Sequence, residues 1–133
     1  MIRLKNLLFL LMLLPAAAAY ADQGTPALES IARALSSGDA DGLAKYFGNN
    51  VEISILDKEQ TYSKTQGTDV LRGFFNTNKP KSFSQVHRGT SRENSDQYCI
   101  GNLVTGAGNY RVYLYLKVAG SNVTVQEIRF DKE

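Results

Sequence analysis

Few side chains in this sequence have types and spacing suited to acid–base or nucleophilic chemistry. His87 is the only histidine, and as a general base it would need a carboxylate or a substrate within hydrogen-bond reach. The surrounding segment, residues 82–92, contains no acidic residue. Cys99, the only cysteine, lies in an apolar segment, so we expect a buried rather than a reactive thiol. His87 is therefore only a weak candidate for a catalytic residue.

Metal and cofactor motifs are not evident in the sequence. One histidine, one distant cysteine and scattered acids give no recognisable ligand spacing. No nucleophile motif of the G-x-S-x-G type occurs, and the glycines at 106–108 join two predicted strands rather than open a helix. We therefore expect no metal site and no cofactor.

A ligand pocket is the more favoured kind of site. If residues 106–108 form a three-residue loop, Thr105 pairs with Asn109, and Tyr98 and Asn102 face the core among aliphatic residues. Polar groups on an apolar face need partners, and a few convergent polar groups in an apolar cleft are typical of ligand sites. Alternatively, these groups lie at the sheet ends and bond to loops or water. The predicted ligand-binding residues are Tyr62, Tyr98, Asn102 and Gln126.

The segment 109–118 predicts a strand with two different faces. Val112, Leu114 and Leu116 alternate on one side, which we expect to face the core. Tyrosine and arginine are enriched at protein interfaces, so the opposite side predicts a homodimer contact. A solvated face covered by tyrosines and long basic side chains is the alternative. The predicted interface residues are Arg111, Tyr113, Tyr115 and Lys117.

The elements that must position these residues follow from local patterns. Three helices are predicted, starting near Thr25, at Asp39 and at Ser63, with the second carrying Leu43, Tyr46 and Phe47. A short hairpin precedes the third helix, and period-two patterns after it predict four strands. This order predicts an α+β fold in which three helices cover one face of a curved, mainly antiparallel sheet. The four predicted strands are 82–92, 97–105, 109–118 and 122–131.

The N-terminal residues are typical of a secretory signal peptide. Arg3 and Lys5 precede a short apolar run, and Ala19-Tyr20-Ala21 is typical of a cleavage site. We therefore predict a signal peptide at 1–21, a single mature domain at 22–133, and a periplasmic or secreted location. Removing the leader leaves 13 basic residues of the original 15 against 13 acidic ones, so neither nucleic acid nor a membrane surface is an expected partner.

Three segments resemble a family of small exported bacterial proteins of uncharacterised function. These are YSKTQGTDVLRGFF (62–75), VHRG (86–89) and YCIGNLVTGAGNYRVYLYLK (98–117). The resemblance implies the nuclear transport factor 2-like fold, also called cystatin-like, in which helices and a curved sheet enclose a cone. It implies no activity, since this superfamily contains enzymes and non-enzymes alike.

Two functions are compatible with these observations. The favoured one is a non-enzymatic exported domain that binds a small apolar or amphipathic ligand, or a protein partner. The alternative is a lyase or isomerase that works in the same pocket with His87 and tyrosine hydroxyls. A structural or assembly module that uses only the tyrosine face is a weaker third possibility.

Overall fold

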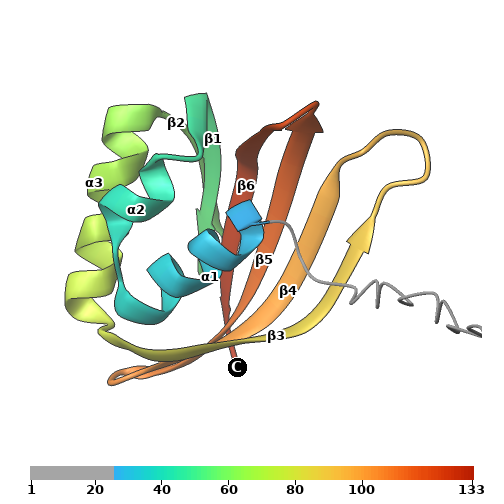
Figure 1. Ribbon diagram of the computed structural model, residues 1–133. Coiled ribbons are helices and arrows are strands. Elements are labelled where there is room, and N and C mark those ends of the chain that lie inside the picture. The colour runs from blue at the N-terminus through green and yellow to red at the C-terminus, as the bar shows by residue number, and fades with distance from the viewer. Residues whose placement is uncertain (1–25) are drawn as a thin grey trace, which may run out of the picture.

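The computed structural model describes residues 26–133, so the predicted signal peptide and the predicted cap Thr25 lie outside the described residues. No helix within 26–133 is long and apolar enough to cross a membrane. Within these described residues, three helices and six strands follow one another (Figure 1). They are α1 (Pro26–Ser37), α2 (Ala40–Ala44), β1 (Phe47–Ile55), β2 (Lys58–Ser63), α3 (Lys64–Thr77), β3 (Pro80–Thr90), β4 (Gln97–Thr105), β5 (Gly108–Ala119) and β6 (Asn122–Lys132).

The second and third helices begin at the predicted caps. The Asp39 carboxylate accepts a hydrogen bond from Gly42 N at 2.9 Å, and the Ser63 hydroxyl accepts one from Gln66 N at 3.2 Å. Such caps satisfy backbone donors that have no partner inside the helix. The prediction that α2 extends through Phe47 is wrong, because Phe47 is buried and already belongs to β1.

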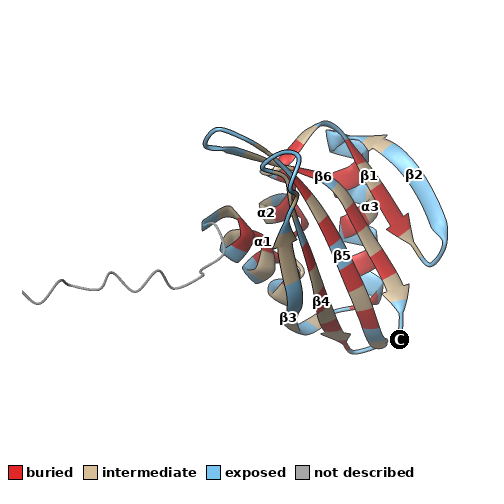
Figure 2. Ribbon diagram, turned by 90° about the vertical axis from the view of Figure 1, so that its right-hand side faces the viewer, coloured by how far each residue is buried: buried red, intermediate tan, exposed pale blue. Residues whose placement is uncertain are grey.

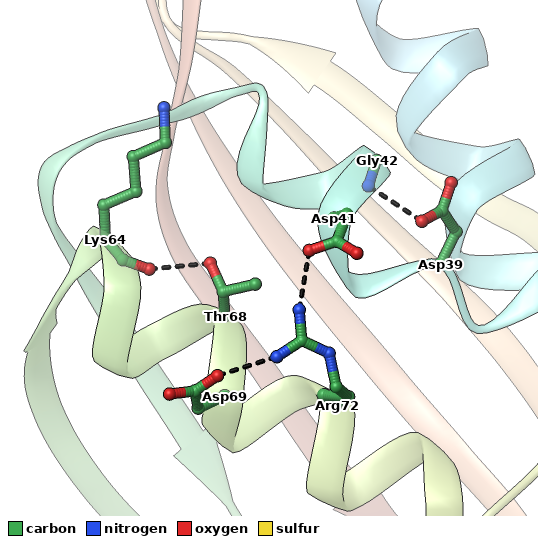
Figure 3. Close-up of polar contacts among 7 residues, drawn as sticks. All are labelled: Asp39, Asp41, Gly42, Lys64, Thr68, Asp69 and Arg72. Carbon is green, nitrogen blue, oxygen red and sulfur yellow. Dashed lines mark hydrogen bonds and ion pairs between the residues drawn. The ribbon is translucent and has the colours of Figure 1, made fainter.

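Figure 3 shows the polar contacts between the second and third helices. The Arg72 guanidinium lies 2.7 Å from the carboxylate of Asp41 on α2 and 2.7 Å from that of Asp69 on its own helix. All three side chains are well exposed to solvent. Exposed ion pairs of this kind contribute about 0–1 kcal/mol, so packing rather than this bridge holds the helices together.

The six strands form one curved sheet in the order β2-β1-β6-β5-β4-β3 (Figure 1). Only the β1–β6 pair is parallel, and the other neighbours are antiparallel. The predicted α+β class with a curved, mainly antiparallel sheet is thus confirmed. The first helix contacts β3, and α3 contacts β1 and β2.

One hydrophobic core joins helices and sheet. Phe74 and Phe75 of α3 pack on Phe130 of β6, with ring centroids 4.5 and 6.3 Å apart respectively. In Figure 2, buried positions alternate with partly or fully exposed ones along β4, β5 and β6, as expected for strands with one face on a core. Fully buried residues of this core include Ile31, Leu35, Leu43, Leu71, Leu103, Val112, Leu116, Val125 and Ile128.

The loop between β4 and β5 is one residue shorter than predicted, and this changes a strand face. Thr105 pairs with Gly108, so only Gly106 and Ala107 form the loop. The Thr105 hydroxyl accepts a hydrogen bond from Ala107 N at 3.1 Å and donates one to the Gly108 carbonyl at 2.6 Å. The predicted pairing of Thr105 with Asn109 is therefore wrong by one residue. Because side chains alternate, this shift turns Tyr98 and Asn102, which were predicted to face the core, to the other side.

A β-bulge also changes the position of Gln126. Tyr115 pairs with Glu127 whereas Leu116 pairs with Val125, so Gln126 is left without a partner on β5. An extra residue of this kind breaks the strict alternation of a strand. Gln126 is exposed, and its predicted place on the core face is wrong.

Candidate functional site

The side of the sheet that faces away from the hydrophobic core, here called the outer face, brings together most of the predicted site residues. Two cross-strand rows run over it. The first row is Glu59, Ser54, Arg129, Tyr113, Ile100 and His87, in the spatial order of the strands. The second row is Thr61, Glu52, Glu127, Tyr115, Tyr98 and Gly89.

Tyrosine side chains line a shallow hollow on this face. Its volume is about 220 Å³, and its lining combines apolar rings with one acid and one base. Tyr113 is 38% exposed and Tyr98 is 37% exposed, so both rings are accessible to a ligand or a partner. The hollow lies between residues Tyr98, Ile100, Tyr113, Tyr115, Glu127 and Arg129.

His87 lies at the rim of the hollow and contacts a tyrosine. Its Nε2 atom is 3.2 Å from the Tyr98 hydroxyl, and the two ring centroids are 5.6 Å apart. The Tyr98 ring also lies across Gly89, where a side chain would collide with it. No carboxylate in residues 26–133 hydrogen-bonds to His87, so the pair lacks the acid that would orient a catalytic base.

Asp96 fixes the position of Tyr115, which also lines the hollow. The Tyr115 hydroxyl donates a hydrogen bond to Asp96 Oδ2 at 2.7 Å, and Val118 N donates one to Asp96 Oδ1 at 3.1 Å. These bonds, above all the one from Tyr115, lower the pKa of Asp96, and the same contact raises the pKa of Tyr115. Sequence reasoning missed Asp96, because it lies in a polar loop between strands and gives no sign of its partner.

Asn102 points to the outer face rather than to the predicted core pocket. Its Oδ1 atom accepts a hydrogen bond from Arg111 Nε at 2.9 Å, across the β4–β5 pair. The Arg111 guanidinium also bonds to the Glu133 carboxylate at 2.9 Å. Asn102 thus positions Arg111, and its predicted role in an interior pocket does not fit the observed register.

The four predicted ligand-binding residues are not brought together. Tyr98 lines the outer hollow, whereas Tyr62 lies on the edge strand β2 and packs against the core beside α3. Three strands separate β2 from β4, and Gln126 projects from the bulge. The predicted interface residues do share one face: they all alternate with the buried residues of β5. They are Arg111, Tyr113, Tyr115 and Lys117.

Three acids from three different strands converge on the outer face. Carboxylate oxygens of Glu52, Glu59 and Glu127 lie within 4.8 Å of one another, in an arrangement that could hold a metal ion. The hydrogen bond with Glu59, then partial burial and the charge of Glu127, raise the pKa of Glu52. The sequence offered no ligand spacing because each acid comes from a different strand.

Cys99 is buried, as predicted, at 1% exposure. Burial raises the pKa of its thiol to about 11. At neutral pH the group is therefore a protonated, apolar core residue and not a nucleophile.

The comparisons with known proteins identify the family. Residues 28–131 match the model of a domain of unknown function, DUF4783. The chain belongs to the DUF4783 family. No curated protein is significantly similar to this DUF4783 chain.

Crystal structures of other DUF4783 proteins have the same fold. One from Bacteroides ovatus is 30% identical, with a TM-score of 0.73 over 78% of this chain and 93% of that one. Another from Bacteroides uniformis is 29% identical, with a TM-score of 0.74 over 83% of this chain and 98% of that one. These relatives confirm the predicted resemblance to an uncharacterised bacterial family.

More distant structures confirm the fold type alone. An NTF-2 like protein of unknown function from Silicibacter pomeroyi is 8% identical, with a TM-score of 0.60 over 80% of this chain and 90% of that one. A cystatin-like domain of unknown function from Nostoc punctiforme is 7% identical, with a TM-score of 0.61 over 80% of this chain and 73% of that one. At such identities a shared fold implies no shared activity.

Proposed function

We propose that this DUF4783 protein is an exported, non-enzymatic binding domain that takes a small amphipathic ligand in the hollow on its outer face. The observation that carries the proposal is the lining of this hollow. The rings of Tyr98, Tyr113 and Tyr115 offer flat apolar surface, while Glu127 and Arg129 offer an acceptor and a donor beside them. A few polar groups within an apolar lining are what orient a small ligand.

The size of the hollow restricts the ligand. Sites that bury drug-sized molecules have volumes of roughly 300–1,000 Å³, whereas this hollow has about 220 Å³. A single flat ring with polar substituents fits this space, with the ring against tyrosine and the substituents toward Arg129 or Glu127.

Ligand binding can be tested by nuclear magnetic resonance with a library of ring-containing fragments. We expect shift changes to gather at Tyr98, Tyr113 and Arg129. Tyr113→Ala should weaken binding, while Tyr113→Phe, which keeps the ring, should retain most of it. Val86→Ala is a control at an exposed apolar residue that does not line the hollow. Shift changes confined to the helix-facing side would contradict the proposal.

Export is part of the same proposal and rests on the N-terminal sequence. The basic start, the apolar run and Ala19-Tyr20-Ala21 favour cleavage before Asp22. N-terminal sequencing of the protein recovered from outside the cytoplasm should therefore start at or near Asp22. A product that retains Met1 would contradict export by this route.

A lyase or isomerase remains the second candidate function. The 3.2 Å contact between His87 Nε2 and the Tyr98 hydroxyl favours it, because this pair lies at the rim of the hollow. An enzyme of this kind would lose turnover in His87→Ala while it kept ligand affinity. If the protein is the binding domain that we propose, neither the wild type nor His87→Ala would show turnover.

We propose self-association as the alternative use of the outer face, because a second copy packed on Tyr113 would cover the hollow. Arg111, Tyr113 and Lys117 project from β5, and Glu127 with Asp131 on β6 supplies opposite charge. In a two-fold contact each patch meets its own copy, so a surface with both signs of charge is self-complementary.

A further inference from the structure

The acidic cluster on the outer face spans the edge of the sheet. Glu59 belongs to the edge strand β2, Glu52 to its neighbour β1 and Glu127 to β6. Their carboxylate oxygens lie within 4.8 Å of one another although the residues are on three strands. An ion bound by all three would connect the edge strand to the interior of the sheet.

A buried hydroxyl lies on the same face of the sheet as these carboxylates. Ser54 is 1% exposed, and its Oγ atom has no hydrogen-bond partner among the described residues. Ser54 is paired with Glu59 and is two residues from Glu52, so its side chain points to the face on which the carboxylates meet. Buried polar atoms normally have partners, and an unpaired one calls for an explanation such as an ion that is not present.

The negative charge of the three carboxylates is also not balanced by neighbouring cations in the part of the chain that the structure describes. The three carboxylates carry up to three negative charges, and the nearest cation in their rows is Arg129, opposite Ser54. Arg129 also forms an ion pair with another acid, because its Nε atom lies 3.4 Å from the carboxylate of Asp131. The cluster thus retains an excess of negative charge that a divalent cation would neutralise.

We propose that Glu52, Glu59, Glu127 and the Ser54 hydroxyl bind one Ca²⁺ ion. All four ligands are oxygen atoms, which hard cations prefer. Ca²⁺ accepts irregular coordination by six to eight oxygens, whereas Mg²⁺ requires a near-ideal octahedron. Long glutamate side chains from three strands, with water completing the shell at the exposed side, suit the less demanding ion.

The proposal is tested by calorimetric titration of the metal-depleted full-length protein with CaCl₂ at neutral pH and constant ionic strength. We expect one ion per chain, with a dissociation constant no weaker than about 10⁻³ M, the range of extracellular calcium modules. Mg²⁺ should bind more weakly. Glu59→Gln, at an exposed edge position, should weaken Ca²⁺ binding about tenfold or more, since even the loss of an outer-shell partner of a metal ligand typically costs that much.

Two further variants separate this site from a general charge effect. Glu93→Gln removes the same charge from an exposed loop and should leave Ca²⁺ affinity unchanged. Ser54→Ala removes only the unpaired hydroxyl and should weaken binding while the protein remains folded. Absence of Ca²⁺ binding to the wild-type protein, or equal binding by wild type and Glu59→Gln, would overturn the proposal. Tighter binding of Mg²⁺ than of Ca²⁺ would overturn the choice of ion.

Discussion

The Tyr115 hydroxyl donates a 2.7 Å hydrogen bond to the carboxylate of Asp96, which ties the β3–β4 loop to the outer face of β5. The pKa of Asp96 is lowered by this bond and by the bond from Val118 N. The loop that carries Asp96 therefore becomes part of the wall beside the hollow. The hydrogen bond between Tyr115 and Asp96 also makes the stability of the fold depend on pH.

Stability should fall in acid because of Asp96. The pKa of Asp96 is 3.8 in the unfolded chain and lower in the folded protein. Between these two pKa values the unfolded state therefore binds more protons than the folded state. The contribution of Asp96 is thus present above pH 3.8 and is lost as the pH falls through the lower, folded value. Tyr115→Phe should flatten this acid dependence, as measured by urea unfolding at a series of pH values from about 5 to about 2.5. An unchanged pH profile in Tyr115→Phe would show that the bond does not form in solution.

The strand register predicts opposite effects for two neighbouring residues of β4. Leu103 is fully buried, and Leu103→Ala should cost about 2–5 kcal/mol in the free energy of unfolding. Asn102 faces outward and bonds to Arg111, so Asn102→Leu should cost only about 1 kcal/mol. Chemical denaturation of both variants measures the difference. A larger loss for Asn102→Leu than for Leu103→Ala would mean that the faces of β4 are reversed.

Two glycines of α3 should respond differently to alanine. Alanine is favoured over glycine in a helix by about 1 kcal/mol, and Gly73 has open space beside it, so Gly73→Ala should stabilise the protein. At Gly67 the new Cβ would lie 2.7 Å from Val51 Cγ1, within the core, and the helix would have to shift. Gly67→Ala should therefore lower the thermal unfolding temperature while Gly73→Ala raises it. Two shifts of the same sign would contradict the close packing of α3 on β1.

Self-association through the outer face should depend on Tyr113. The ring is 38% exposed and on the side of β5 opposite the core, so Tyr113→Ser should leave the monomer folded. If two copies pack through this face, the change should weaken the dimer by about 2 kcal/mol or more, as truncation of an interface anchor does. Sedimentation velocity over a range of protein concentrations measures this, with Lys45→Ala on the helix side as a control. A wild-type protein that stays monomeric at high concentration would contradict self-association and indicate that the outer face is solvated.

Local patterns in the sequence were sufficient for the elements and the fold class. The side chains of Asp39 and Ser63 act within three residues of their own position, so both helix starts could be predicted. The two faces of β5 also follow from alternation alone, because the period of a strand is two residues. The helix-then-sheet order of these elements then leads to the α+β class.

The tertiary structure alone decided which residues meet. A loop one residue shorter than predicted turned Tyr98 and Asn102 outward, since a slip by one residue exchanges the two faces of a strand. The bulge at Gln126 and the parallel pairing of β1 with β6 depend on packing between distant segments. For the same reason the sequence shows no metal-ligand motif that includes Glu52, Glu59 and Glu127. Only the folding of three strands into one sheet brings their carboxylates together.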